Sequence, residues 1–585
     1  MRHSLLILLL SLTYSVHALS VPTGKQCKSI AGLTGWPDPP VWKKFNTTLS
    51  GALLEPLPPA QACYTSVSNS SSTNMLCDYS TSSWKLSSFH SADPVSVAYP
   101  NWQDDACVPP LLSEGSGRCS LDAFPKYVVN ASTAEHVAQT VKFAASNSVR
   151  IVVKGGAHDL LGRSTAPSVL SLWTRHLQGF QYHERFSACP SDSTRYTAIT
   201  AAAGHVTGEI QQMAADHNMT IVGAADPSVG LGGFLTGGGH SPLGSLHGMA
   251  VDNVLQLSLV TPNGDIITAS PCRNPDIFWA VRGGGGATFG VLVNATLRAY
   301  PVPTIALARF EFNSSHDEAT SNSNNAFYAA AASVIADMPA LYSEGLAGYF
   351  SLMPISTSND GLPQMNFAFL IYLLNGSLGQ LQGALDPIMS RLNATPEFTT
   401  SITTQYVPNY LGFQSSFFVA DKVGNNRLTV SRLWGEQAVA NKSGVEQTLR
   451  KFSSQMLQGT CVSGEGVQKK SSDDSALNPA WRRTVVEMMS GIPYPLGANA
   501  SKRDNTMTQA DMLSTALSEQ APDMGTYSNE AWIHQADFRK AFWGEHYARL
   551  LAIKRRIDPK GVFWCQWCVG AEDWVLGDGG ALCKA

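Results

Sequence analysis

Apolar and polar positions follow two different periods in the first half of the chain. Short continuous apolar runs at 150–153 and 196–203 predict buried strands. Apolar residues recur three and four positions apart over 133–146 and 206–218, which predicts amphipathic helices. Strands and helices therefore alternate through 124–301, and this region is predicted to be a mixed α and β domain.

The pattern changes further along the chain. Two strand-like runs flank the turn sequence Pro-Asn-Gly-Asp at 262–265, which predicts a β-hairpin over 255–269. The apolar run 365–374 predicts a buried strand, and the spacing over 327–338 and 444–457 predicts helices. The residues after about 303 are therefore expected to form a second, α+β domain.

The last third of the chain gives two further expectations. The polar stretch 499–504 predicts an exposed loop. A helix is expected over 538–556, and Pro559 and Gly561 would stop it.

Composition indicates a globular protein and argues against nucleic acid as a partner. Of the 585 residues, 44% are hydrophobic and 14% are charged, which suits a chain with a large core. The net charge is −4, from 40 basic and 44 acidic residues, with no long basic run. Nucleic acid is therefore not expected as a partner.

The N-terminus MRHSLLILLLSLTYSVHALS has a basic start, an apolar stretch and small residues before a cleavage position. It predicts a secretory signal peptide over 1–18, with an N-terminal anchor helix as the alternative. No later stretch is long and apolar enough to span a membrane. Secretion would also permit N-glycans at the Asn-X-Ser/Thr acceptors. These are Asn46, Asn69, Asn130, Asn218, Asn294, Asn313, Asn375, Asn393, Asn441 and Asn499.

Cysteine usage fits an oxidising compartment. Five of the 11 cysteines (Cys27, Cys63, Cys77, Cys107 and Cys119) lie in the N-terminal segment, where disulfides would staple a loop-rich region. Because the total is odd, at least one thiol is left outside an intramolecular disulfide. The Cys-X-X-Cys at 565–568 is weak evidence for zinc or redox exchange and favours a structural disulfide.

Three glycine-dense stretches suggest a ligand site. They are KGGAHDLLGRST (154–165), GLGGFLTGGGHSPLG (230–244) and RGGGGATFG (282–290). Glycines let backbone N–H groups approach phosphates, although each could serve only a tight turn. Neither Gly-X-Gly-X-X-Gly nor a P-loop is completed, which disfavours a Rossmann NAD enzyme. The chain also lacks His-Glu-X-X-His and Gly-X-Ser-X-Gly, so we expect no metal site and no hydrolase serine.

The long stretches 152–180, 226–255 and 274–301, together with 525–532, 542–565 and 569–574, resemble a known family. They are similar to the vanillyl-alcohol oxidase / p-cresol methylhydroxylase (PCMH) flavoproteins, in the berberine-bridge-enzyme-like branch, and most of all to its secreted, isoamyl-alcohol-oxidase-like fungal members. The resemblance implies an α+β protein with a two-part PCMH-type FAD-binding domain and a substrate domain built on a large antiparallel sheet. The expected segments are a signal peptide (1–18), a cysteine-rich segment (19–120), the FAD domain (121–302), the substrate domain (303–520) and a C-terminal segment returning to the FAD domain (521–585).

The resemblance places His158 where this branch attaches FAD covalently through the flavin 8α-methyl group. Where some members carry a second, cysteinyl link, this chain has Asp226. A single link through His158 is therefore expected. Lys154 is expected to help neutralise phosphate charge, and Val291 to pack near the adenine. The other expected FAD residues are Gly155, Gly156, Ala157, Asp159, Ser164, Val229, Gly230, Gly232, Gly233, Gly237, Gly238, Gly239 and Cys565.

For catalysis, the resemblance points to Tyr527 as a tyrosine facing the flavin, and Glu530 and Tyr372 are further candidates; His240 and His247 are expected to be structural. The implied activity is FAD-dependent oxidation of an alcohol, or an oxidative cyclisation, on a small hydrophobic or secondary-metabolite substrate, with molecular oxygen as acceptor. An oligosaccharide oxidase is the alternative enzyme. A catalytically silent, flavin-binding secreted protein is the alternative of another class.

Overall fold

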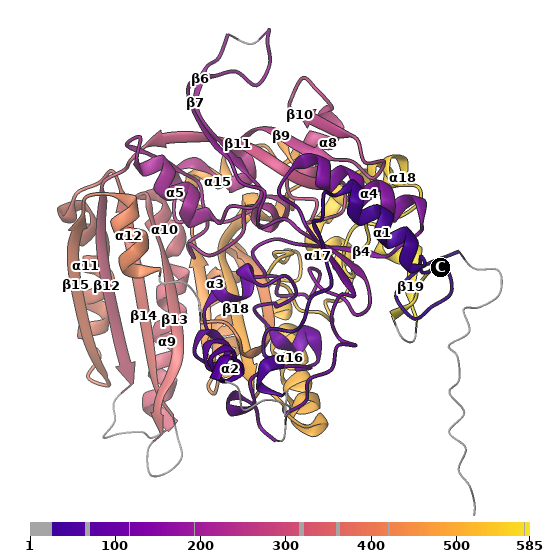
Figure 1. Cartoon of the computed structure of the whole chain (residues 1–585). Helices are drawn as coiled ribbons and strands as arrows, with labels where there is room; N and C mark the ends of the chain where they lie inside the picture. Colours follow the sequence, from indigo (N-terminus) through magenta and orange to yellow (C-terminus); the bar gives the residue numbers. More distant parts are fainter. Residues whose placement is uncertain are drawn as a thin grey trace, which may run out of the picture.

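The computed structural model describes residues 26–64, 71–115, 117–191, 193–314, 321–357, 363–418, 422–577 and 580–585. The expected signal peptide and the acceptor Asn69 lie outside these residues. Helices and four sheets make an α+β fold with one large antiparallel sheet, which confirms the expected fold class. Figure 1 shows this large sheet from the left edge to the centre and the smaller sheets toward the top and right.

The first of the smaller sheets contains the parallel strands of the molecule. β3 and β4 both pair parallel to β5, and β2 adds an antiparallel edge. The helix α4 (Ala134–Ser146) connects β3 to β4, and the Thr133 side chain caps its N-terminus by accepting a hydrogen bond from the His136 N–H. In spatial order the strands are β2 (Leu53–Leu54), β3 (Tyr127–Asn130), β5 (Leu170–Trp173) and β4 (Ile151–Lys154).

A six-stranded sheet follows, and β11 is its longest strand. The predicted hairpin is confirmed, because β9 and β10 pair antiparallel with Val260 opposite Ile266. The path is β10 (Ile266–Ala269), β9 (Val254–Val260), β11 (Val291–Pro301), β7 (Tyr196–Ala202) and β6 (Phe180–Phe186), with β8 (Met219–Ile221) also on β11.

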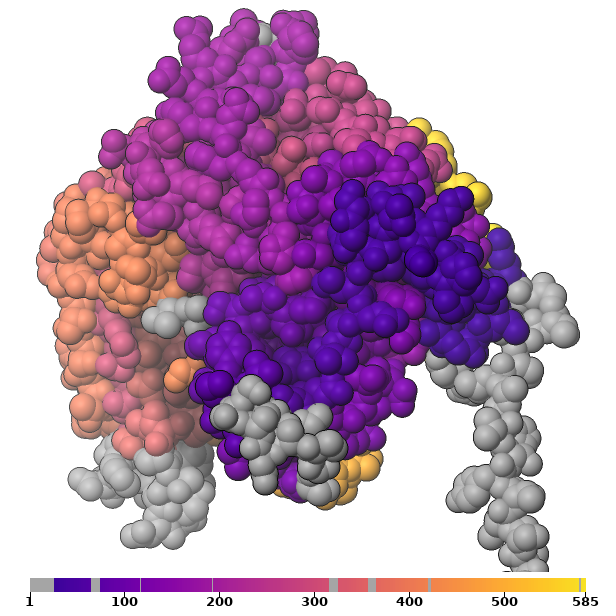
Figure 2. All heavy atoms as spheres, in the orientation of Figure 1, coloured from indigo at the N-terminus to yellow at the C-terminus, as the bar shows by residue number. Residues whose placement is uncertain are grey.

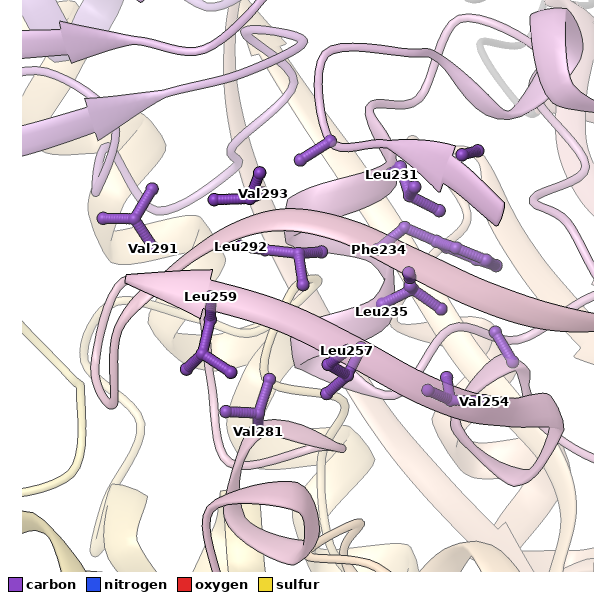
Figure 3. Packing of buried hydrophobic residues seen from close by; sticks show 14 of the residues in the cluster. Leu231, Phe234, Leu235, Val254, Leu257, Leu259, Val281, Val291, Leu292 and Val293 are labelled. Carbon is purple, nitrogen blue, oxygen red and sulfur yellow. The ribbon is translucent and has the colours of Figure 1, made fainter. Parts of the chain in front are cut away.

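Helix α6 (Leu231–Gly237) packs inside this region. Figure 3 shows its residues Leu231, Phe234 and Leu235 close to β9 and β11, which contribute apolar side chains such as Leu257 and Val293. All five side chains are buried, so the glycine-rich chain around 230–237 is fixed by the core behind it.

The large sheet has seven antiparallel strands. In spatial order they are β15 (Phe398–Val407), β12 (Ile305–Ser314), β14 (Pro363–Leu374), β13 (Leu346–Thr357), β17 (Leu457–Cys461), β18 (Thr484–Tyr494) and β16 (Asn426–Gly435). The principal helices packed on them are α9 (Ser321–Ala336), α11 (Leu378–Asn393), α14 (Lys442–Arg450) and α16 (Ala500–Gln520). The shorter helices are α5 (Thr207–Ala215), α7 (Gly244–His247), α8 (Pro275–Val281), α10 (Met338–Ser343), α12 (Tyr410–Phe417), α13 (Glu436–Ala440) and α15 (Gly464–Gln468).

The N-terminal and C-terminal parts of the described chain meet. β1 (Cys27–Lys28) pairs with β20 (Leu582–Lys584), which pairs with β19 (Trp574–Leu576), and a disulfide joins Cys27 to Cys583. Helices α1 (Pro39–Thr48), α2 (Ser71–Ser83) and α3 (Ser87–Ala92) belong to the N-terminal segment, which covers much of the face shown in Figure 2. The other disulfides are Cys63–Cys77, Cys107–Cys119, Cys189–Cys272 and Cys565–Cys568.

Three expectations about elements are wrong. The stretch 499–504 is not a loop, because Asn499 caps α16 by accepting a hydrogen bond from the Lys502 N–H. The helix expected over 538–556 is interrupted at Gly544, whose φ is +56°, and becomes α17 (Phe538–Trp543) and α18 (Tyr547–Ile557). The helix expected over 444–457 ends at Arg450. Among the described residues, no helix has the length and apolarity needed to cross a membrane.

Candidate active site

A cavity of about 860 Å³ lies between the glycine-rich loops and the large sheet. This volume is within the usual range for small-molecule and cofactor sites. One wall consists of residues within 155–164, 224–236 and 286–292, which lie in loops, in α6 and at the start of β11. The opposite wall comes from one face of the large sheet, with alternate residues such as Tyr349 and Ser351, or Met489 and Gly491, on the lining.

The glycine wall is shaped by two backbone segments that nearly touch. A Cβ added to Gly156 would lie 2.8 Å from the backbone N of Gly230, and a Cβ on Gly230 would lie 2.8 Å from the backbone N of Gly156. Only glycine allows this approach. By contrast, a Cβ on Gly232 or Gly233 would meet nothing within 4 Å. These two glycines leave room for a ligand to approach the backbone.

Most of the expected FAD residues lie on this cavity, and they come together from segments far apart in the sequence. Those on the lining are Gly155, Gly156, Ala157, His158, Asp159, Ser164, Asp226, Val229, Gly230, Gly232, Gly233 and Val291. Lys154, Gly237, Gly238, Gly239 and Cys565 are not on it.

Lys154 does not serve the phosphate role expected for it. Its side chain is 1% exposed, and Nζ donates hydrogen bonds to the backbone carbonyls of His90 (3.0 Å) and Asp93 (2.8 Å). The alternation along β4 places Lys154 on the side away from the cavity, where the N-terminal segment covers it.

Gly237, Gly238 and Gly239 support the cavity from behind. A Cβ on Gly237 would lie 2.1 Å from Nδ2 of Asn529, and Gly239 donates its N–H to the Tyr527 hydroxyl. Cys565 likewise lies behind the wall. It is bound to Cys568, and its Sγ is 3.8 Å from the carbonyl oxygen of Gly286, which does line the cavity.

His158 lies in a short hydrogen-bonded chain. Its Nε2 is 2.8 Å from Oγ of Ser228, and that hydroxyl donates to Oδ1 of Asp226 at 2.6 Å. The Ser228 N–H donates to the same Oδ1 at 2.8 Å. Asp226 therefore holds both polar groups of Ser228, and Ser228 contacts the imidazole.

Asp159 is held by an ion pair that also joins two parts of the chain. Its carboxylate accepts from Nε of Arg163 at 2.8 Å. The Arg163 guanidinium also donates to the carbonyl of Ser528 and to Oδ1 of Asn529. The loop that carries His158 is thereby tied to the C-terminal segment that carries Tyr527 and Glu530.

Tyr527 lines the cavity, and its ring is almost completely buried. The hydroxyl accepts hydrogen bonds from the Gly239 N–H (3.2 Å) and from Nδ2 of Asn529 (3.0 Å). Burial raises the pKa of Tyr527 above its usual range, and the negative charge of Glu530 adds to the effect. The phenol is therefore protonated at neutral pH and suited to donate a hydrogen bond.

Glu530, His240 and Glu487 form a cluster beside Tyr527. Nε2 of His240 is 3.1 Å from Oε1 of Glu530 and 4.0 Å from Oε2 of Glu487. Glu487 is fully buried, and neither of its carboxyl oxygens has a hydrogen-bond partner among the described residues. Burial raises the pKa of Glu487 well above its usual range, with the charge of Glu530 as the second cause.

This cluster bears on the role expected for His240 and on the expected absence of a metal site. His240 lies on the cavity between two carboxyl groups, a position open to chemistry as well as to the mainly structural role expected for it. His247, in contrast, stacks on Tyr300 with ring centroids 3.6 Å apart, a packing contact. His240, Glu487 and Glu530 also bring potential metal ligands within 4.8 Å of one another. The expected absence of a metal stays a prediction.

Tyr372 is not part of the site. It is fully buried, and its hydroxyl donates to the carbonyl oxygen of Pro242 at 2.8 Å. Its ring packs edge-on against Phe413. Along β14 the residues on the cavity are Ala368 and Leu370, so Tyr372 shares their face but lies beyond the end of the cavity.

The sheet wall mixes apolar and cationic groups. Phe417, Phe418 and Leu370 supply apolar surface, while Arg309, Lys422 and Arg427 supply positive charge. The Arg427 guanidinium lies across Gly491 on the next strand, where a Cβ would be 2.1 Å from Nε. The sequence did not indicate these residues, because only the folded chain brings them together. Some lie on strands of the large sheet, and Phe417, Phe418 and Lys422 lie at the end of α12 or between α12 and β16.

Two family models match this chain. One, described as an FAD binding domain, matches residues 125–270, and one described as berberine and berberine like matches 526–569. An uncharacterized FAD-linked oxidoreductase of Arthroderma benhamiae is 31% identical and covers 99% of this chain and 98% of its own. A VAO-type flavoprotein oxidase of Thermothelomyces thermophilus is also 31% identical, over 96% and 95%.

The chain belongs to the VAO-type, berberine-like family of FAD-linked oxidoreductases. A crystal structure of a VAO-type flavoprotein from Myceliophthora thermophila C1 superposes with a TM-score of 0.88 at 29% identity, over 96% of this chain and 100% of that one. This confirms the resemblance, an enzymatic role and FAD as the cofactor.

The cavity fits the cofactor of this VAO-type oxidoreductase. Gly232 and Gly233 leave open space beside their backbone, and the close approach of Gly156 to Gly230 lines one side of the cavity with main chain instead of side chains. Such backbone can approach phosphate oxygens closely. His158 and Tyr527 also line this cavity.

Proposed function

We propose that this protein is a secreted oxidase that oxidises an alcohol on a small hydrophobic or secondary-metabolite substrate, with one FAD bound covalently to His158 and with molecular oxygen as the acceptor. The observation that carries the proposal is the single cavity that joins His158 on the glycine wall to the carboxyl cluster of Glu530 beside Tyr527. An oxidative cyclisation would use the same machinery, because it begins with the same removal of hydrogen.

The chemistry divides between the cofactor and the protein. FAD supplies an acceptor for hydride from the substrate carbon. The protein must bind the alcohol, exclude water and remove the hydroxyl proton. The apolar residues of the sheet wall perform the first two tasks, and Arg309 and Arg427 orient polar substituents from the same wall.

We assign the proton-accepting role to Glu530. It faces the cavity, and its Oε1 is 3.1 Å from Nε2 of His240. Glu487 is less suited to the role, because it is fully buried and its pKa is raised well above the usual range. Tyr527 fits a different task. With its pKa raised by burial and two N–H groups already pointing at its oxygen, it donates its own proton to a ligand atom instead of accepting one.

The proposed location rests on chemistry outside the site. Among the described residues, five disulfides are formed, which suits an oxidising compartment. The signal-like N-terminus and the many glycosylation acceptors agree with secretion, and N-glycans are part of the proposal.

The experiment measures hydrogen peroxide release by the purified flavoprotein across a panel of alcohols that includes oligosaccharides. Activity on small hydrophobic alcohols supports the proposal. Activity confined to oligosaccharides would replace it with the alternative enzyme, and a fully flavinylated protein with no turnover on any substrate would favour the silent binding protein.

Glu530→Gln tests the proton acceptor. We expect kcat to fall roughly 100-fold or more, because general base catalysis contributes on that order. Tyr527→Phe should cost less, and Glu519→Gln, which alters an exposed carboxylate on α16, should be neutral. Stopped-flow measurement of flavin reduction isolates the chemical step. An unchanged reduction rate in Glu530→Gln would remove Glu530 from this role.

A further inference from the structure

The hydrogen bonds that link the side chains of Asp226, Ser228 and His158 have a defined donor and acceptor at each step. Ser228 has one hydroxyl hydrogen, and it is donated to Oδ1 of Asp226 at 2.6 Å. The oxygen of the same hydroxyl lies 2.8 Å from Nε2 of His158. Because Ser228 has already used its hydrogen, Nε2 must be the donor in that contact. The neutral imidazole therefore carries its proton on Nε2, and the lone pair is on Nδ1.

Backbone contacts fix the positions of the side chains in this hydrogen-bonded series. The Ser228 N–H also donates to Oδ1 of Asp226, so the carboxylate sets the position of the serine as well as its hydroxyl direction. The loop is held by hydrogen bonds from the N–H of Gly208 to the carbonyl of Pro227 and from the N–H of Thr207 to the carbonyl of Val229. The contact of Gly230 with Gly156 then locks this loop against the loop that carries His158.

We propose that Ser228 and Asp226 are positioning residues for cofactor attachment: they present Nδ1 of His158 as the nucleophile and accept the Nε2 proton as the bond forms. The inference rests on the proposed covalent link to His158. It gives Asp226 a role of its own at the position where a second, cysteinyl link is absent from this chain.

Formation of the covalent link is balanced by reduction of the flavin ring. A bond forms between Nδ1 of His158 and the 8α carbon, which loses one C–H hydrogen as a proton. The alkylated ring loses its Nε2 proton through Ser228 toward Asp226, and both protons pass on to the solvent or the flavin. The isoalloxazine is reduced by two electrons, and molecular oxygen, reduced to hydrogen peroxide, restores the oxidised flavin. Alkylation of a neutral imidazole makes the ring a cation. Loss of the Nε2 proton toward a nearby carboxylate removes this charge and so favours the alkylated product.

The test compares covalent and non-covalent flavin in four variants produced in full-length protein and supplied with FAD. Total bound flavin is read from the visible spectrum of the native protein. Covalent flavin is read after acid precipitation and by fluorescence of the denatured band in a gel. We expect Ser228→Ala and Asp226→Asn to bind FAD but to acquire the covalent link at least tenfold more slowly than wild type. Ser228→Thr keeps the hydroxyl and should restore the rate.

His158→Ala separates this inference from the proposed attachment. If the wild-type protein releases its flavin in acid, or if His158→Ala retains it, the attachment to His158 fails and the relay fails with it. If wild type holds the flavin, His158→Ala releases it, and Ser228→Ala is flavinylated at the wild-type rate, the relay alone is overturned.

A second measurement does not depend on how well the variants fold. NMR of the flavin peptide isolated from wild-type protein assigns the ring nitrogen of His158 that bears the flavin. Attachment through Nδ1 is expected, and attachment through Nε2 would overturn the relay, because Nε2 is the nitrogen that Ser228 occupies.

Discussion

At the scale of single residues, Lys154 is a buried ammonium that binds the protein itself. Its Nζ reaches two backbone carbonyls, and the charged groups that act on it are Asp93 and Arg175. Burial lowers its pKa from 10.5 to about 7, with Asp93 opposing the shift. Lysine in a glycine-rich motif pointed to phosphate in the sequence. What the sequence could not reveal was the N-terminal segment folded over it.

This shift makes stability depend on pH in a defined direction. Between about pH 7 and 10.5 the unfolded chain holds a proton on Lys154 that the folded protein does not, so folding stability rises with pH across that window. The slope is at most about 1.4 kcal/mol per pH unit. In Lys154→Met this contribution is absent. Melting temperatures at pH 7 and pH 9 should therefore rise more in wild type than in the variant, and parallel changes would contradict the assignment.

The candidate site shows which residues a sequence can reveal. His158, Asp226 and Tyr527 lie inside long motifs, so a resemblance found them. Glu487 has no motif around it. It becomes part of the site only because β18 pairs with β16 and β17, and because alternation along β18 places Glu487 on the same face as Met489. The two carboxyl neighbours of His240, Glu487 and Glu530, lie far along the chain, so the sequence does not show that they meet.

At the scale of elements, the local sequence predicts an element well where it allows only one pattern of backbone hydrogen bonds. The hairpin formed by β9 and β10 follows from a turn sequence between two apolar runs. The start of α16 is not recognised from the sequence because Asn499 and Ser501 are of types found in loops as well as at helix starts; in the structure the asparagine is the cap. Gly544 divides the last helix, which the apolar spacing alone did not indicate.

Gly230 and Gly232 are expected to matter for different reasons, Gly230 for packing within the protein and Gly232 for binding of the ligand. In Gly230→Ala the new Cβ would lie 2.8 Å from backbone, which overpacking studies associate with a loss of about 1–3 kcal/mol. In Gly232→Ala the new methyl meets no protein atom, and alanine is the better helix residue. We expect Gly230→Ala to lower the melting temperature of the apoprotein, and Gly232→Ala to leave it unchanged or higher while weakening FAD binding. Equal melting temperatures in the two variants would contradict this reading of the wall.

At the scale of the whole molecule, the α+β fold and the large antiparallel sheet were expected from the family resemblance. Composition and periodicity alone gave only a mixed protein with a change of pattern near residue 303. Neither the resemblance nor the periodicity predicts the spatial order of the seven strands, because β17 and β16 enter the sheet out of sequence order. Two disulfides staple the N-terminal segment, as expected, and its first strand also shares a small sheet with the C-terminal part, which the sequence did not indicate.

The Cys27–Cys583 disulfide spans 556 residues, and the Cys63–Cys77 disulfide spans 14. In the chain-entropy model a disulfide stabilises more when it closes a longer loop, with typical values of about 2–5 kcal/mol. Replacing both Cys27 and Cys583 by serine should therefore lower the thermal midpoint more than replacing both Cys63 and Cys77. The opposite order would show that strain or residual structure, and not loop entropy, sets the contribution.

The same bond makes the covalent skeleton between Cys27 and Cys583 a closed ring. A linear polypeptide falls into two pieces when a protease cuts it once, but a ring that is cut once only becomes a line. Any single nick between these two cysteines would leave every strand of the seven-stranded and six-stranded sheets covalently attached to the rest, since all of them lie within the ring. A protease that cuts once in a loop between these cysteines would therefore leave the cavity in one covalent body.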